Sequence, residues 1–210
     1  MQTNSSRKEI LQRIATASQR RSACLRAIEP KEIYHSIAPD AVVCFKNELE
    51  AINGKCVLCE NEILLYSQIK NFCSEYGVKK MFCRDSYLAG QLDKNQIAYT
   101  QNEAEFESID AGITGCEFLV ARTGSVIVSS ASPSGRQMHA FPPVHIVVAH
   151  VSQLVDYLSD AYALIQEKYG EYLPSAITTI TGPSRTADIE KTLVLGAHGP
   201  KELVVFLCLE

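Results

Sequence analysis

The sequence predicts an α/β protein in which a mostly parallel β-sheet carries helices on both faces. Two observations lead to this prediction. Short apolar runs with little polar alternation, such as VHIVVAH and ELVVFLCLE, are typical of strands that are buried on both faces. Segments of helical periodicity lie between most of these runs, and such alternation favours a parallel sheet. The length of 210 residues suits one domain, residues 1–210, with a helical N-terminal segment over about residues 5–53.

Two helices are predicted before the first strand. Ser5 or Ser6 can cap a helix that runs to about Ile28. The apolar residues spaced for its inner stripe are Ile10, Leu11, Ile14, Leu25 and Ile28. A second helix fits residues 40–52, and Gly54 ends it.

Strands and helices then alternate. KCVLCE is predicted to be a strand, and Asn61 can cap the helix that follows it and runs to about Tyr76. The next three elements are a strand over VKKMFCR, a short helix over residues 85–92 and a strand over QIAYT.

The middle of the chain interrupts this alternation. Residues 112–132 hold two β-prone runs that join at Arg122-Thr123-Gly124, which predicts a β-hairpin excursion. After a polar loop come a strand over VHIVVAH and a helix that Ser152 can cap, running to about Tyr169. The last predicted elements are a strand over SAITTIT, a short helix over residues 185–193 and a strand over ELVVFLCLE.

Composition and charge argue against two classes of function. The net charge of −4 gives no basic surface for nucleic acid. No apolar run approaches the roughly 20 residues that span a bilayer, and MQTNSSRKEI lacks the apolar segment of a signal peptide. We therefore expect a cytoplasmic protein that binds neither nucleic acid nor membranes.

The eight cysteines and the histidines do not form a metal motif. CVLC, with Cys56 and Cys59, is the one CxxC, and alternation along a strand would point its two thiols to opposite faces. His145 and His150 would likewise face opposite sides of one strand, so the set His139, His145 and His150 fails as a metal trio. We expect the cysteines to pack as small apolar residues. There is also no GxGxxG segment to bind a dinucleotide.

One segment, TGPSRTADIEKTLVLGAHGP (residues 181–200), is too polar and too rich in glycine for core packing. We predict that Gly182 and Pro183 turn the chain into a helix that Ser184 caps. Such a turn at the carboxyl end of a parallel strand would bind a small anion through helix N–H groups and Arg185. His198 would reach the same ligand from the loop GAHGP. The alternative is a capped turn in which Arg185 pairs with Asp188.

Four segments together resemble one protein family. They are GITGCEFLVARTGS, GRQMHAFPPVHIVV, the segment TGPSRTADIEKTLVLGAHGP and the closing ELVVFLCLE. In them the chain resembles the LUD-domain family, specifically its lactate utilization protein C branch (LutC, also called YkgG). The resemblance is strong from Gly112 to the C-terminus, whereas the N-terminal half resembles the family only in the layout of its elements.

The resemblance implies a fold like that of the NagB/RpiA/CoA-transferase proteins. It also implies a role in oxidising L-lactate to pyruvate with two iron–sulfur partner proteins. Those partners would carry the clusters, so this chain would need no cofactor of its own. The family often has an acidic residue where this chain has Arg122, and that departure could change the charge of a ligand or of a partner contact.

The matching segments supply the candidate ligand-binding residues. These are Thr123, Gly124, Arg136, His145, Gly182, Ser184, Arg185, Thr186, Asp188, His198 and Gly199. We expect the hairpin turn and the loop of Arg136 to lie within about 15 Å of the 181–200 loops, around one small carboxylate or phosphate ligand.

Three kinds of function stay open on the sequence. The chain can be a subunit of a lactate-oxidising iron–sulfur complex that binds a small acid or a partner surface. It can be a separate transferase or isomerase acting on a phosphorylated or CoA-linked substrate, for which Asp188 or Glu190 would supply the carboxylate. It can also be a ligand-sensing domain without chemistry.

Overall fold

The computed structural model describes residues 3–19, 34, 37, 39–186, 194–196 and 198–210. Its contacts divide the chain into two compact units, Met1–Ser36 and Ile37–Glu210, so the predicted helical segment 5–53 is split between them. The first unit holds helix α1 (Thr3–Gln19). The predicted inner stripe is wrong for Ile10, Leu11 and Ile14, which are each more than half exposed. Leu25 and Ile28 lie outside the described residues.

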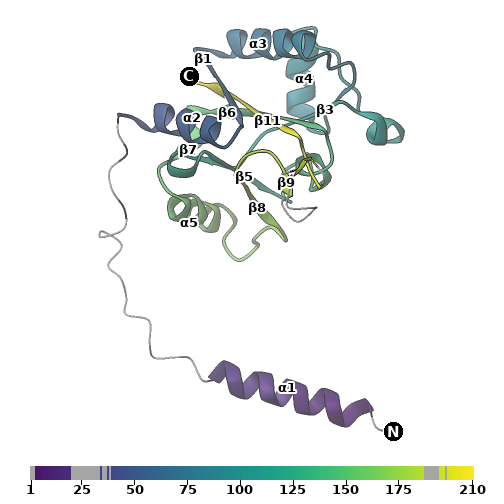
Figure 1. The fold of residues 1–210 in the computed structure, drawn as a ribbon, viewed down its shortest axis with the longest axis vertical. Helices are drawn as coiled ribbons and strands as arrows, with labels where there is room; N and C mark the ends of the chain where they lie inside the picture. Colours follow the sequence, from purple (N-terminus) through teal and green to yellow (C-terminus); the bar gives the residue numbers. More distant parts are fainter. Residues whose placement is uncertain (1–2, 20–33, 35–36, 38, 187–193, 197) are drawn as a thin grey trace. The chain divides into compact units, whose positions relative to one another are not determined.

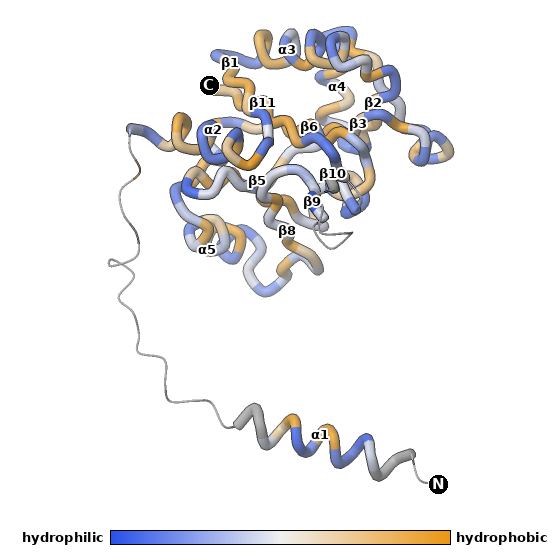
Figure 2. Tube along the Cα trace, in the orientation of Figure 1, coloured by the Kyte–Doolittle hydropathy of each residue, from blue (hydrophilic) through white to orange (hydrophobic). Residues whose placement is uncertain are grey.

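A five-stranded sheet in the order β1-β11-β6-β3-β2 forms the centre of the second unit. Its strands are β1 (Lys55–Cys59), β2 (Met81–Phe82), β3 (Ala111–Thr114), β6 (Val144–His150) and β11 (Glu202–Cys208). Every neighbouring pair is parallel, which confirms the predicted class. Figure 2 shows the apolar character of β11, whose residues 203–208 are all buried.

A second, four-stranded sheet has the order β7-β4-β5-β8. Its strands are β4 (Phe118–Val120), β5 (Ser125–Ser129), β7 (Leu154–Val155) and β8 (Ile177–Ile180). Strands β4 and β5 form the predicted hairpin, and the 3₁₀ turn η3 (Ala121–Thr123) joins them. Strand β8 runs antiparallel to β5, so the run SAITTIT belongs to this sheet and not to the parallel one.

Helices cover both faces of the parallel sheet (Figure 1). Helices α3 (Glu62–Glu75) and α4 (Ser86–Lys94) pack on one face, where Leu65 and Leu92 share a core with Phe206. Helix α2 (Ala41–Ala51) and the inner side of the second sheet pack on the other face. Helix α5 (Leu158–Tyr169) closes the outer side of the second sheet, against Val120 and Ile127.

The predicted helix starts mostly hold. Asp40, Asn61 and Asp85 each accept backbone N–H groups at the start of α2, α3 and α4.

The helix predicted from Ser152 is wrong in its first turns. Residues 151–153 form the 3₁₀ turn η5 (Val151–Gln153), and β7 follows because it finds β4 as a parallel partner. The apolar pairs of this segment fit either a strand or a helix, and pairing with β4 decides between them.

The remaining short elements lie between these layers. They are η2 (Glu103–Ser108), η4 (Gln137–His139), β9 (Arg185–Thr186) and β10 (Val194–Leu195). The strand predicted over QIAYT is reduced to one bridge between Thr100 and Phe82. None of the described helices is long and apolar enough to cross a lipid bilayer.

Candidate functional site

The described residues of the 181–200 segment lie at the amino edge of the parallel sheet. The N–H of Ser184 donates to the carbonyl of Pro200 over 2.9 Å, and the N–H of Lys201 donates to the carbonyl of Pro143 over 2.8 Å. Pro143 and Lys201 directly precede β6 and β11. The predicted position at the carboxyl edge is therefore wrong. It assumed that SAITTIT runs with the parallel strands, and an apolar run does not reveal its direction.

The predicted helix start at Arg185 is also wrong, and the rest of that predicted helix, residues 187–193, lies outside the described residues. Arg185 and Thr186 form β9, which pairs antiparallel with β10. Ser184 is thus not a helix cap, and its carbonyl accepts the N–H of Gly196 over 2.9 Å. The Arg185 guanidinium donates to the carbonyl of Ile52 at the end of α2. Asp188 and Glu190 lie outside the described residues, so their roles stay predictions.

Several predicted site residues nevertheless meet near the end of α2. The hydroxyl of Ser125 lies 2.7 Å from that of Thr123 and 2.8 Å from that of Thr181. Gly124 packs so tightly that an added Cβ would lie 2.2 Å from the backbone nitrogen of Leu49. Gly182 approaches the carbonyl of Ile52 in the same way, and Gly199 lies against Ser184. These contacts are internal to the protein, and they explain why glycine is needed at 124 and 182.

Arg136 is not part of this group. Its guanidinium donates to the hydroxyl of Ser175, which precedes β8, whereas Thr181 follows β8. Six residues of extended chain cover roughly 20 Å. Arg136 and the hairpin turn therefore lie at opposite ends of β8, and the structure does not bring them to one ligand. His198 is exposed on its loop.

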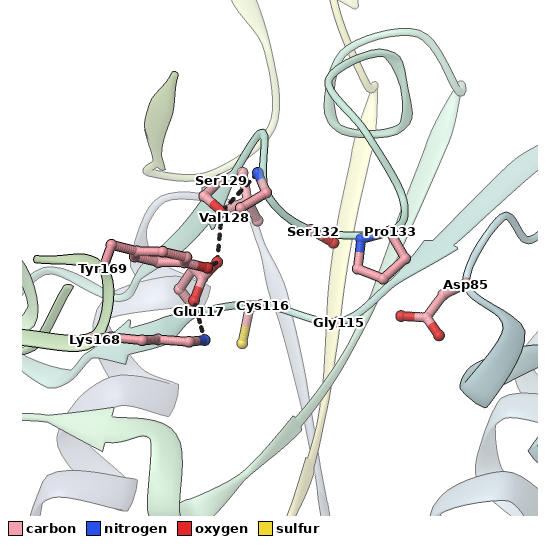
Figure 3. A pocket seen from close by; sticks show the side chains of 11 residues that line it. Asp85, Gly115, Cys116, Glu117, Val128, Ser129, Ser132, Pro133, Lys168 and Tyr169 are labelled. Carbon is pink, nitrogen blue, oxygen red and sulfur yellow. Dashed lines mark hydrogen bonds and ion pairs between the residues drawn. The ribbon is translucent and has the colours of Figure 1, made fainter. Parts of the chain in front are cut away.

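A cavity of about 220 Å³ opens at the other edge of the sheet (Figure 3). We call it the carboxyl-edge cavity, because Asp85 and Gly115 in its wall follow the carboxyl ends of β2 and β3. Its other polar wall residues include Glu117, Ser129, Ser132 and Lys168. Open α/β sheets bind their ligands at this edge.

Glu117 is the most constrained side chain of the carboxyl-edge cavity. It is 8% exposed. Its Oε1 accepts hydrogen bonds from Ser129 Oγ (2.5 Å) and Tyr169 Oη (2.7 Å), and its Oε2 accepts one from Lys168 Nζ (2.8 Å). Burial raises the pKa of Glu117, but the hydrogen bonds from Lys168, Ser129 and Tyr169 outweigh it, so the net pKa is lowered. The group is therefore a carboxylate at neutral pH.

Glu117 stands in the segment GITGCEFLVARTGS but is not among the candidate residues predicted from the sequence. A signal existed, because GITGCEFLV carries one charged residue in an otherwise apolar stretch and a buried charge needs partners. The neighbouring Cys116 is a neutral thiol, since burial and, to a smaller extent, the charge of Glu117 raise its pKa to about 12.

The charged side chains that line the carboxyl-edge cavity are Asp85, Glu117 and Lys168. The two carboxylates carry two negative charges against the single positive charge of Lys168. This cavity therefore does not suit a small free anion.

A second polar group is buried between the parallel sheet and the 129–140 loop. It consists of Thr114, His139 and His145, and we call it the buried histidine cluster. Nε2 of His145 lies 2.9 Å from Oγ1 of Thr114, and the two imidazole centroids are 5.8 Å apart. Among the described residues, neither Nδ1 of His145 nor the ring nitrogens of His139 have a partner with good hydrogen-bond geometry, although the Ser129 backbone lies close enough to act on His139.

Both histidines of this cluster are neutral. Burial, and to a smaller extent His139, lowers the pKa of His145 to about 3. Burial also lowers the pKa of His139, against a smaller opposite effect of the Ser129 carbonyl. Over the described residues, no set of three or more His, Cys, Asp or Glu side chains has the geometry to hold a metal ion.

The parallel sheet, the layers on its two faces and the cavity at its carboxyl edge define an open α/β protein. Residues 43–208 match the LUD domain family, and the chain belongs to that family. Its fold is also that of a solved structure, a DUF162 family protein from Deinococcus radiodurans, with a TM-score of 0.59 and 18% identity over 80% of this chain and 96% of the other.

Several relatives are named lactate utilization protein C. Lactate utilization protein C of Bacillus subtilis is 33% identical over 193 residues, which cover 81% of this chain and 79% of the relative. Lactate utilization protein C of Geobacillus kaustophilus is 36% identical over 132 residues, which cover 60% of this chain. The chain spans 55% of the length of that relative.

Proposed function

We propose that this protein acts in L-lactate utilization. The observation that carries the proposal is the similarity to lactate utilization protein C of Bacillus subtilis, which extends over 81% of the chain. The family match, over residues 43–208, includes the whole parallel sheet. In this role the protein takes part in the oxidation of L-lactate to pyruvate in the cytoplasm.

The proposed share of this chain is to bind a small acid or a partner surface, while two iron–sulfur proteins carry the electrons. The positions of its cysteines support the proposal that the clusters are on the partners and not on this chain. Cys59 packs with Phe206 on the side of α3, whereas Cys56 packs with Phe45 on the side of α2. The two thiols of the CxxC therefore lie on opposite faces of β1 and cannot hold one cluster together.

A growth experiment tests the proposal. A Bacillus subtilis strain that lacks its own lactate utilization protein C is supplied with the gene for this chain and grown on L-lactate as the sole carbon source. The strain without the gene is the baseline, and growth on glucose is the control for general fitness. Restored growth on lactate is expected. Failure of a chain that is expressed and folded, in a strain that its native gene does rescue, would contradict the proposal.

A second candidate function is catalysis at the carboxyl-edge cavity. The specific observation that favours it is the buried carboxylate of Glu117, held by Lys168, Tyr169 and Ser129 at the edge where α/β sheets bind ligands. Glu117→Gln separates the two candidates in the same strain. A folded Glu117→Gln protein that still supports growth on lactate excludes a reaction through this carboxylate, and loss of growth favours it.

A further inference from the structure

Strand β1 lies at one edge of the parallel sheet, and no described strand pairs with its outer side. The N–H of Leu209 donates to the carbonyl of Cys59 over 2.8 Å, so the backbone polar groups of Cys59 face β11. Backbone groups alternate in direction along a strand, and those of Cys56 and Leu58 therefore face outward. The outer edge of β1 thus offers the N–H and C=O groups of both residues to another strand.

The middle of this edge lacks the features that commonly keep edge strands from pairing with other chains. Charged side chains, proline, bulges and covering segments are the usual protection. The three central residues of β1 are apolar, and Val57 and Leu58 are partly exposed on opposite faces of the sheet. At the other edge, by contrast, the N–H of Thr100 donates to the carbonyl of Met81 over 2.8 Å and covers β2. Within the described part of the chain, the β1 edge is open to pairing.

A second copy of this chain suits the edge. Two copies related by a two-fold axis can pair their β1 strands antiparallel, and a register centred on Val57 aligns all five residues of each strand. Cys56 of each copy then faces Leu58 of the other, and these pairs exchange main-chain hydrogen bonds. Val57 faces Val57 of the second copy in a close pair of β-branched side chains. Lys55 faces Cys59, so no charge of β1 lies opposite a like charge.

The same pairing brings α3 to its copy at a packing distance. Helix α3 covers both β1 and β11, because Phe72 shares a core with Phe206 and Val57 packs against that core. Adjacent strands are about 4.8 Å apart, so the helix over β1 and β11 and its copy over the paired strands lie about 10 Å apart. Packed helices are usually about 8–10 Å apart. Pairing of the strands therefore also pairs the helices.

The side of α3 that borders this edge is exposed and uncharged in its middle. A cavity of about 210 Å³ lies between α3 and the strands, and Val57, Gln68 and Asn71 are among the residues of its wall. Leu64, four residues before Gln68 and so on the same side of the helix, is 41% exposed. A single peptide strand would bond to the edge of β1 but leave this side of α3 uncovered. A second copy covers both.

We propose that this protein forms a two-fold dimer in which β1 pairs antiparallel with β1 of a second copy. The two five-stranded sheets then join into one sheet of ten strands, and the two α3 helices cover the junction on one face. Because the strands run in opposite directions across the axis, the two carboxyl-edge cavities open at opposite ends and each copy keeps its own. The inference does not depend on the role in lactate utilization.

The first experiment traps the interface with a disulfide in the full chain. Val57→Cys places two thiols opposite each other, and the Cα atoms of such a pair are about 4.5 Å apart, within the range that a disulfide spans. Dioxygen with a copper catalyst should convert this variant to a covalent dimer on a non-reducing gel. Wild type measures any crosslinking by the native cysteines. Tyr172→Cys is the matched control, because this position is 88% exposed and lies outside β1 and α3.

The second experiment measures the mass in solution by sedimentation equilibrium. Wild type should show twice the mass of one chain at concentrations up to about 100 µM. Val57→Lys sets two ammonium groups face to face and should raise the dissociation constant of the dimer at least about a hundredfold. Val78→Lys is the matched control, since Val78 is also partly exposed but precedes β2 at the other edge. Circular dichroism establishes that each variant is folded.

Three results would overturn the inference. They are a wild type that stays monomeric over the whole concentration range, a Val57→Cys variant that crosslinks no faster than Tyr172→Cys, and a folded Val57→Lys variant that dimerises as well as wild type. The last result would place the interface elsewhere on the molecule. The growth experiment is independent of all three, so a monomeric chain that restores growth on lactate would reject the dimer and leave the proposed function in place.

Discussion

Nζ of Lys168 donates a hydrogen bond of 2.8 Å to Oε2 of Glu117, and this contact joins the end of α5 to the start of the β-hairpin. The side chain of Lys168 is half exposed, whereas that of Glu117 is buried. The pair is thus the polar link between the outer helix and the wall of the carboxyl-edge cavity. Exposed ion pairs contribute little to stability, but a buried charge depends strongly on its partners.

Glu117→Gln is expected to lower the free energy of unfolding by about 1–3 kcal/mol, because three hydrogen bonds lose their charged acceptor. Glu103→Gln is the matched control, since Glu103 forms an exposed pair with Arg84. Its cost should be clearly smaller, because solvent screens an exposed carboxylate. Urea unfolding of both variants at neutral pH measures the loss of unfolding free energy in each. Equal losses would show that burial does not strengthen the interaction of Glu117 with Lys168.

Gly124 should tolerate no side chain, for a structural reason. Its φ of 58° is in the left-handed region, and a Cβ would lie 2.2 Å from the Leu49 nitrogen. Gly77 has a similar φ of 64° but open space around it. Gly77→Ala should therefore cost only the backbone strain of about 1–2 kcal/mol, and Gly124→Ala should cost clearly more. Thermal unfolding of both variants checks this, and similar losses would remove the argument from the Leu49 contact.

Stability should fall in mild acid because of the buried histidines. The pKa of His139 and of His145 is lower in the folded chain than the ordinary value of about 6.5. As the pH falls below about 6.5, the unfolded chain binds protons that the folded chain does not. Stability is thus complete above this pH and is lost toward the folded-state pKa, which is about 3 for His145.

The expected slope is about 1.4 kcal/mol per pH unit for one histidine. Urea unfolding without ligand between about pH 6.5 and 5 measures it above the range in which carboxylates titrate. His145→Gln should reduce the slope, and His150→Gln, at the partly exposed end of β6, controls for the loss of a histidine. A wild-type slope near zero would contradict the neutral, buried state of the pair.

Metal analysis should find well under one iron or zinc per chain. The physical reason is the orientation of Cys56 and Cys59 toward different cores, which keeps the CxxC from acting as a pair. Purified protein should therefore be colourless, and Cys56→Ser should not alter its metal content. One equivalent of metal that is lost in Cys56→Ser would contradict this prediction.

The sequence predicts the parallel sheet well, since the runs of β1, β6 and β11 are apolar on both sides and the fold buries both. It also predicts helix starts at Asp40, Asn61 and Asp85, where the side chain itself makes the cap. The direction of β8 could not be predicted, because pairing with β5 sets it and pairing is not local. That single error moved the 181–200 segment to the wrong edge of the sheet.

The candidate site was predicted only in part, because its contacts also join segments that are far apart in the sequence. Contacts of Thr123, Gly124, Gly182 and Arg185 do converge near α2, but they are structural contacts within the chain. Glu117 was missed because its partners, Lys168 and Tyr169, lie about fifty residues away in sequence. His145 was selected through a motif, but its proximity to His139 follows only from the fold.

The central claim is that this chain takes part in lactate oxidation, and reconstitution tests it most directly. The two iron–sulfur proteins proposed as partners are purified, and pyruvate formation from L-lactate is followed with an artificial electron acceptor as the chain is added. The rate should rise with added chain and reach a plateau near a fixed ratio of the chain to the partners. Pyruvate formation at the same rate with and without the chain would contradict it.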